Sequence, residues 1–218
     1  MSFFLVKMPP WNLAALQDVV RVEDPQKALF VVRSFPGDER KGMACSVKKE
    51  SGGVYLVTCK DVANPEDIGR NDGKSLVADR FCTRYPNHKN KHRIKIQDIR
   101  NDDEFSFIPL SQSSVSVSTF QLYEDGNGTF ARSCYSLAVI DNKRSEQIEW
   151  VYDNVKKRHV IKTDDELGNT TKISLGSPVL GTVGNRTFVV GVVGLDSDFQ
   201  FLPIFFERNT HKIPGKKD

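Results

Sequence analysis

The side chains that could support hydrolytic chemistry fall in three separated parts of this sequence. Asp61 ends one apolar run, Glu104 begins a second, and Ser174 and Ser177 precede a third. A serine hydroxyl attacks a carbonyl well only when a neighbouring imidazole takes its proton and a carboxylate orients that imidazole. No histidine lies in these three segments, because the four histidines are His88, His92, His159 and His211. The segments therefore offer carboxylates and hydroxyls to a site, but no imidazole.

Strands must position these residues, because helical periodicity is scarce. Short apolar and β-branched runs alternate with Gly, Asn, Asp and Pro at intervals of roughly 8 to 12 residues, which is typical of an all-β barrel or sandwich. The predicted strands of the first half are 28–35, 42–49, 53–59, 75–83, 93–96 and 105–109, and those of the second half are 119–123, 130–140, 159–162, 177–183, 186–195 and 201–206. Helices are predicted at 11–20 and 146–155, although the second segment could equally be a pair of strands.

Two sets of six strands joined by a polar link predict two β-barrels with short helices. The predicted units are an N-terminal extension (1–27), a first barrel (28–110), a Ser-rich connection (111–118), a second barrel (119–206) and a basic tail (207–218). With 218 residues, the chain is long enough to bury such a core without disulfides or metals.

Composition excludes the disordered and membrane classes. Charged residues make up 27% and apolar residues 39% of the chain, and the net charge of +3 falls short of the field of a dedicated nucleic-acid-binding domain. No signal peptide or membrane span is predicted, so we expect an intracellular, cytoplasmic protein with reduced cysteines. These cysteines are Cys45, Cys59, Cys82 and Cys134.

Basic stretches near residues 88–95 and 156–162 form the candidate basic patch. Its residues are Lys89, Lys91, His92, Arg93, Lys95, Lys156, Lys157 and Arg158. Such runs are usually solvated loops, and nearby acidic residues keep the local net charge low. No phosphate-binding glycine loop and no metal-ligand spacing occurs in the sequence, so we expect no cofactor and no metal.

The three segments, taken in order, resemble the catalytic segments of trypsin-like serine proteases. Residues 42–47 (G-M-A-C-S-V) and 53–62 (G-V-Y-L-V-T-C-K-D-V) resemble the hairpin that ends in Thr-x-x-His-Val and delivers the family's catalytic histidine. Residues 102–110 (D-D-E-F-S-F-I-P-L) resemble the strand that carries the family's orienting aspartate. Residues 174–180 (S-L-G-S-P-V-L), followed by V-V-G-V-V-G, are similar to the segment Gly-Asp-Ser-Gly-[Gly/Ser]-Pro-Val and the strand after it.

The resemblance implies a chymotrypsin-like double barrel whose three catalytic positions are replaced. Asp61 stands at the histidine, Glu104 at the aspartate (Asp103 if the register slips by one) and Leu175 at the nucleophilic serine. A leucine has no nucleophile, and a carboxylate is a much weaker base than imidazole at neutral pH. Ile173 replaces the glycine that usually turns an amide toward the oxyanion. The residues expected to line the remaining cleft are Cys59, Lys60, Ser174, Gly176, Ser177 and Gly191.

The resulting hypothesis is a non-catalytic, trypsin-like domain that binds a protein or peptide, by strand addition or surface docking, with a regulatory role. Two alternatives stay open: an active hydrolase with an unusual site, for example one built on the Cys59 thiol, and RNA binding through the basic loops. No membrane partner is expected.

Overall fold

A computed structural model describes most of the chain from residue 25 to residue 206. The described ranges are 25–48, 53–68, 75–81, 93–102, 104–110, 119–122, 133–140, 144–162, 173–183 and 186–206. The predicted helix at 11–20, the connection at 111–118 and the tail at 207–218 lie outside them. Within the described ranges, the elements are fourteen strands and two short 3-10 helices, η1 (Pro25–Ala28) and η2 (Pro65–Asp67).

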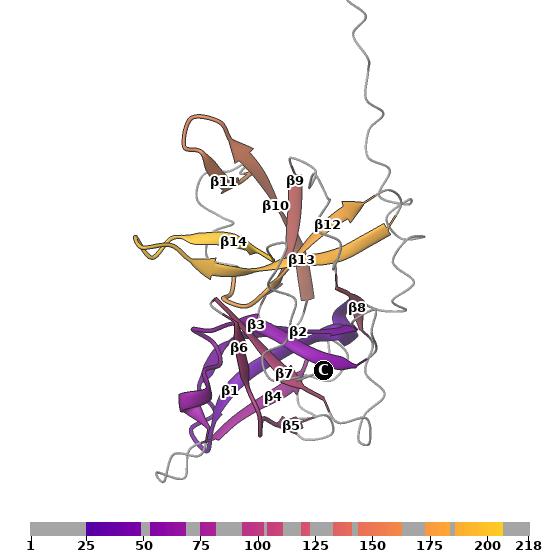
Figure 1. The fold of residues 1–218 in the computed structure, drawn as a ribbon, viewed down its shortest axis with the longest axis vertical. Helices are drawn as coiled ribbons and strands as arrows, with labels where there is room; N and C mark the ends of the chain where they lie inside the picture. Colours follow the sequence, from indigo (N-terminus) through magenta and orange to yellow (C-terminus); the bar gives the residue numbers. More distant parts are fainter. Residues whose placement is uncertain are drawn as a thin grey trace, which may run out of the picture.

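The larger sheet has eight strands and lies in the lower half of Figure 1. They are β1 (Leu29–Phe35), β2 (Arg40–Lys48), β3 (Val54–Cys59), β4 (Ser75–Arg80), β5 (Arg93–Lys95), β6 (Arg100–Asp102), β7 (Phe105–Pro109) and β8 (Phe120–Gln121). The strand order is β5-β4-β1-β2-β3-β7-β6, with β8 paired to β2. Residues 96–99 join β5 directly to β6, so the chain itself connects the two outer strands and the sheet curls into a barrel.

The smaller sheet has six antiparallel strands and lies in the upper half of Figure 1. They are β9 (Ser133–Ile140), β10 (Arg144–Asp153), β11 (Arg158–Ile161), β12 (Pro178–Val183), β13 (Arg186–Leu195) and β14 (Phe201–Phe205). The order is β11-β10-β9-β12-β13-β14. The two outer strands meet through side chains, because the rings of His159 on β11 and Phe205 on β14 have centroids 4.9 Å apart. This contact closes the second barrel.

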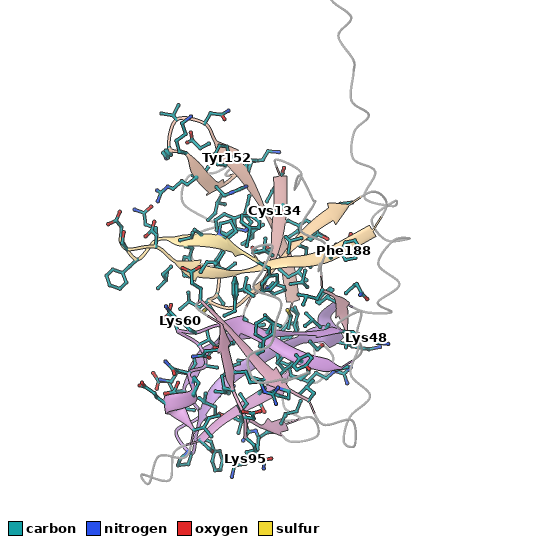
Figure 2. The ribbon with its side chains drawn as sticks, viewed as in Figure 1. Lys48, Lys60, Lys95, Cys134, Tyr152 and Phe188 are labelled. Atoms are coloured by element: carbon teal, nitrogen blue, oxygen red, sulfur yellow. The ribbon has the colours of Figure 1, made fainter. Side chains whose placement is uncertain are left out.

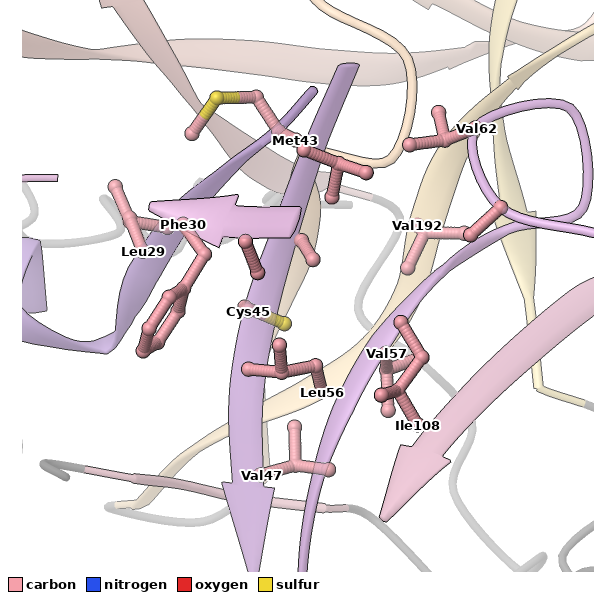
Figure 3. Packing of buried hydrophobic residues seen from close by; sticks show 14 of the residues in the cluster. Leu29, Phe30, Met43, Cys45, Val47, Leu56, Val57, Val62, Ile108 and Val192 are labelled. Carbon is pink, nitrogen blue, oxygen red and sulfur yellow. The ribbon is translucent and has the colours of Figure 1, made fainter. Parts of the chain in front are cut away.

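One apolar cluster holds the two sheets together. Strands β2 and β3 supply Met43, Cys45 and Leu56, and the smaller sheet adds Val189 and Val192 to the same cluster. Figure 3 shows Met43, Cys45 and Leu56 beside β2, with Val192 of the smaller sheet next to them. Burial of this much apolar surface is the main stabilising contribution to the fold and fixes one barrel against the other.

The structure confirms the predicted fold class, an all-β double barrel with very little helix. The helix predicted at 146–155 is wrong: the segment is extended, as its alternative had it, but it holds one strand, β10, and the start of the turn that leads to its hairpin partner β11. Ile148 and Trp150 are buried while Gln147 and Glu149 are exposed, which is the period of two of a strand. Strand β6 was not predicted, because Arg-Asn-Asp carries no apolar residue.

The segment that follows the connection differs from its predicted grouping. Residues 119–123 were expected in the second barrel, but β8 pairs in parallel with β2 of the larger sheet, and the adjacent Leu122 forms a bridge to Val189 of β13. The chain thus crosses between the sheets while touching both. The boundary at residue 119 stays a prediction.

Candidate functional site

The turn at residues 174–177 is tied to both sheets by backbone hydrogen bonds. The amide of Met43 on β2 donates to the carbonyl of Leu175 (2.8 Å), and the amide of Gly176 donates to the carbonyl of Val193 on β13 (2.8 Å). In return, the amide of Val193 donates to the carbonyl of Ser177 (2.8 Å). The turn, hereafter the 174–177 turn, therefore lies where the two barrels meet.

Gly176 occupies this turn because no larger residue fits. Its φ of +75° lies in the left-handed region, and a Cβ atom there would be 2.0 Å from the carbonyl oxygen of Met43 and 2.1 Å from Oγ1 of Thr58. The Thr58 hydroxyl already donates to that same carbonyl (2.6 Å). The backbone of the turn therefore lies directly against Met43 of β2 and Thr58 of β3.

The segments that carry Asp61 and Glu104 lie beside each other. The amide of Lys60 donates to the carbonyl of Glu104 (3.1 Å), next to the paired residues Cys59 and Phe105. Both acidic side chains are exposed. They stand at the end of β3 and the start of β7, so the two segments share one end of the first barrel.

Val62 connects this end of the barrel to the 174–177 turn. A Cβ atom on Gly42 would lie 2.5 Å from Cγ2 of Val62 and 2.7 Å from the carbonyl oxygen of Leu175, so both groups border Gly42. The structure therefore brings together the three segments that carry Asp61, Glu104 and Leu175. The catalytic roles assigned to these positions by the resemblance stay predictions.

Leu175 is partly buried and packs against the cluster that joins the two sheets. An apolar side chain is stabilised there by the same burial that holds the barrels together. The two neighbouring serine hydroxyls differ in their hydrogen bonding. Ser174 Oγ accepts a hydrogen bond from Nη2 of Arg40 (2.7 Å). Ser177 Oγ is buried without a hydrogen-bond partner among the described residues.

The described cysteines are buried free thiols. Burial, with a smaller contribution from the charge of Asp61, raises the pKa of Cys59 to about 11. Burial also raises the pKa of Cys45 and that of Cys134, the latter to about 12. A thiol acts as a nucleophile through its thiolate, so these values leave little reactive form at neutral pH. Cys82 lies outside the described residues.

The one histidine in the described ranges, His159, packs against aromatic rings of the smaller sheet. It lies on β11, at the top of Figure 1, with its ring 5.3 Å from that of Tyr152 and 4.9 Å from that of Phe205. Burial lowers the pKa of His159. Its imidazole closes the second barrel, which is a structural role.

The other residues expected to line the site, Lys60 and Gly191, lie in different environments. Lys60 is exposed beside Asp61. Gly191 faces β14, because a Cβ atom there would lie 2.1 Å from the carbonyl oxygen of Ile204. Gly191 is therefore required for the close pairing of β13 with β14.

Arg40 also lies beside the 174–177 turn, where its Nη2 donates to Oγ of Ser174. The sequence did not predict this neighbour, because a single arginine at the start of a strand forms no recognisable motif.

The candidate basic patch is divided between opposite ends of the molecule. Arg93 on β5 donates to the carboxylate of Asp79 (2.7 Å), whereas Arg158 on β11 donates to that of Asp196 (2.8 Å). Figure 2 shows Lys95 at the bottom of the molecule and Tyr152, the strand partner of His159, near the top. Lys156 and Lys157 are exposed in the β10–β11 turn, and Lys89, Lys91 and His92 lie outside the described residues. In the described part of the chain, these residues do not form one continuous surface.

Two further features bear on binding chemistry. Across the described ranges, no three His, Cys, Asp or Glu side chains gather as a metal ion would require. The described helices are also too short to cross a bilayer. The expected absence of a metal stays a prediction.

Comparisons with known proteins identify the fold. No protein-family model and no curated protein matches the sequence. Among solved structures, Deg5 is similar with a TM-score of 0.54 and 11% identity, over 90% of this chain and 92% of that one. A serine protease of a human pathogenic astrovirus has a TM-score of 0.54 and 11% identity, over 85% of this chain and 93% of that one. Kallikrein-related peptidase 10 has a TM-score of 0.53 and 11% identity, over 84% and 90%.

These neighbours are chymotrypsin-like serine proteases, and the chain has their trypsin-like fold. At 11% identity the likeness establishes the arrangement of strands and no more.

Proposed function

We propose that this chain is a non-catalytic domain of the trypsin-like fold that binds a protein or peptide and acts through that binding. The observation that carries the proposal is the setting of Leu175. Its apolar side chain packs in the cluster between the barrels, at the turn where the resemblance places the nucleophilic serine. Hydrolysis through a serine needs a hydroxyl and a base in contact. In the described ranges the one imidazole lies on β11, and the thiols are buried with raised pKa values.

Among the described residues, strand β13 has an unpaired backbone edge next to the 174–177 turn. Its pairing with β12 ends at Pro178–Val192, but its pairing with β14 continues to Leu195–Phe201. In an antiparallel pair of strands, every second residue forms hydrogen bonds with the partner strand. Asp196 is such a residue, because its amide donates to the carbonyl of Gln200 (3.0 Å). Leu195, one residue earlier, therefore forms no backbone hydrogen bonds with β14. The amide and carbonyl of Leu195 therefore point away from β14. An extended peptide that adds as a strand would bind such groups without any nucleophile.

The catalytic half of the proposal is tested with purified full-length chain. We expect no hydrolysis of casein or of a fluorogenic peptide panel, and no labelling by a fluorophosphonate probe. An active trypsin-like protease serves as the positive control, and heat-denatured chain as the negative control. Time-dependent hydrolysis, or labelling of a single residue such as Ser174, would contradict the proposal.

The binding half is tested by selecting ligands from a random decapeptide library and measuring their affinity by fluorescence anisotropy. Leu195→Pro removes an amide that β14 does not use, so we expect it to abolish binding while the chain stays folded. Leu195→Ala keeps the amide and is the matched control. Failure to select any peptide, or equal affinity of both variants, would count against strand addition on β13.

A further inference from the structure

Arg40 stands at the start of β2 with its guanidinium directed to the 174–177 turn. Its Nη2 donates a 2.7 Å hydrogen bond to Oγ of Ser174, and both residues are partly exposed. A guanidinium has five N–H donors, so the one hydroxyl that Arg40 meets among the described residues uses only a part of this capacity.

The charge of Arg40 has no carboxylate partner among the described residues. Four other arginines have one within ion-pair distance: Arg33, Arg93, Arg100 and Arg158. The adjacent Glu39 pairs with Lys41 (3.5 Å). The strand partner of Arg40 is Arg33, a like charge, and burial together with Arg33 lowers the pKa of Arg40.

A partly buried guanidinium remains charged at neutral pH, and leaving it unpaired is unfavourable. An anion from outside the chain would remove this cost. Ser174 strengthens the site, because its oxygen accepts from Arg40 and its own O–H can still donate. The two side chains can therefore present N–H and O–H donors to one anionic group.

We propose that Arg40 and Ser174 bind a carboxylate of the peptide partner, either an Asp or Glu side chain or a C-terminal carboxylate. The guanidinium fork matches the two oxygens of a carboxylate, and charge-assisted hydrogen bonds of this kind are among the strong ones. The site adjoins the β13 edge, since the 174–177 turn that carries Ser174 is hydrogen-bonded to Val193. In naming the partner as a peptide the inference rests on the proposed function, whereas the anion site itself can be tested alone.

The anion site is tested on full-length chain labelled with ¹⁵N, by following arginine Nε–Hε resonances. Sodium acetate is added against sodium chloride at equal ionic strength. We expect the Arg40 resonance to shift and saturate in acetate alone, and that of Arg80, which bonds to the carbonyl of Lys27, to respond equally to both salts. Arg40→Lys and Arg80→Lys assign the two signals. Equal responses of Arg40 to acetate and chloride would overturn the site, and a response to sodium phosphate but not to acetate would overturn its carboxylate specificity.

The peptide partner is tested with decapeptides selected on the chain. Each acidic residue is changed to its amide, and each C-terminus is prepared free and amidated, which separates the two sources of carboxylate. We expect removal of one carboxylate to weaken binding by about tenfold or more, because hydrogen bonds to charged groups are lost. In Arg40→Gln that sensitivity should disappear, whereas in Arg80→Gln it should persist.

The outcomes separate this inference from the proposed function. Peptides that bind with no dependence on a carboxylate or on Arg40 would overturn the inference and leave the binding function intact. If no peptide binds but acetate still shifts Arg40, the binding function fails and the anion site stands. Circular dichroism of each variant confirms that any loss arises in a folded chain.

Discussion

The hydroxyl of Thr58 on β3 donates a 2.6 Å hydrogen bond to the carbonyl of Met43 on β2, and the amide of Met43 in turn donates to the carbonyl of Leu175. The end of the first barrel and the 174–177 turn of the second are thus linked through one residue. Thr58 and Met43 are both fully buried. In a water-free setting such a hydrogen bond is costly to break, because the carbonyl that loses its partner cannot bind solvent instead.

Thr58→Val should therefore destabilise the chain by about 1–3 kcal/mol, since valine keeps the shape of threonine but leaves a buried carbonyl short of a donor. The free energy of unfolding in urea measures this loss. Thr58→Ser retains the hydroxyl and should cost clearly less. Equal stability of the Val and Ser variants would show that the hydrogen bond does not hold the turn.

Gly176→Ala should be more damaging, with a loss of at least about 2 kcal/mol. Alanine is strained at a φ of +75°, and its Cβ atom would overlap the Met43 carbonyl and the Thr58 hydroxyl. Gly37→Ala is the matched control, because there the nearest atom would be Ser34 Oγ at 3.7 Å. We expect that control to change stability by less than about 1 kcal/mol. Similar losses in both variants would contradict the packing described for the turn.

Cys59 should resist alkylation in the folded chain. Its pKa of about 11 arises mainly from burial and secondly from Asp61, so the thiolate is scarce at pH 7.5. Peptide mapping after treatment with iodoacetamide should show modification of Cys59 in urea but not in buffer. Asp61→Asn removes one contribution to the raised pKa and should make labelling modestly faster. Rapid labelling of the native chain would instead favour the thiol as a nucleophile.

The strands were predictable because their core positions are apolar and their ends are marked by turn residues. Strand β13, for example, was predicted with its observed bounds, and the apolar run of β2 was located to within a few residues. The helical interpretation of 146–155 came from Ile148, Val151, Tyr152 and Val155, whose spacing of three and four residues fits one face of a helix. The observed burial of Ile148 and Trp150 instead follows the period of two of a strand.

The site was predictable only in its sequence order. Gly176 and Thr58 stood in segments that resemble protease motifs, but their mutual contact depends on the distance between two barrels, which no local pattern encodes. The hydrogen bond from Arg40 to Ser174 joins residues far apart in the chain. Pairings of this kind are set by tertiary packing, so they become visible only in the folded molecule.

Lowering the pH should reduce the stability that the contact of His159 on β11 with Phe205 on β14 provides. Burial lowers the folded-state pKa of His159 below its unfolded value of roughly 6.5, so protonation is easier in the unfolded chain. The stability associated with neutral His159 is fully present above the unfolded pKa and is lost as the pH falls through the folded pKa. Urea midpoints should decline more between pH 8 and pH 5 in the parent chain than in His159→Gln. An identical pH dependence would assign the decline to other groups.

Leu175→Ser should leave the chain without proteolytic activity. The change supplies a hydroxyl at the turn, but in the described ranges the one imidazole stays on β11 and the exposed carboxylate of Asp61 stands where the resemblance places the base. A carboxylate takes a proton from a hydroxyl far less readily than imidazole does at neutral pH, so attack on a carbonyl is not assisted. The substitution should also cost about 1–3 kcal/mol of stability, because it removes apolar contacts with the cluster between the barrels. Fluorogenic peptide hydrolysis is compared with that of Leu175→Ala, which loses similar contacts without gaining a hydroxyl. Turnover by the serine variant that the alanine variant lacks would show that Asp61 serves as a base and that the site retains catalytic geometry.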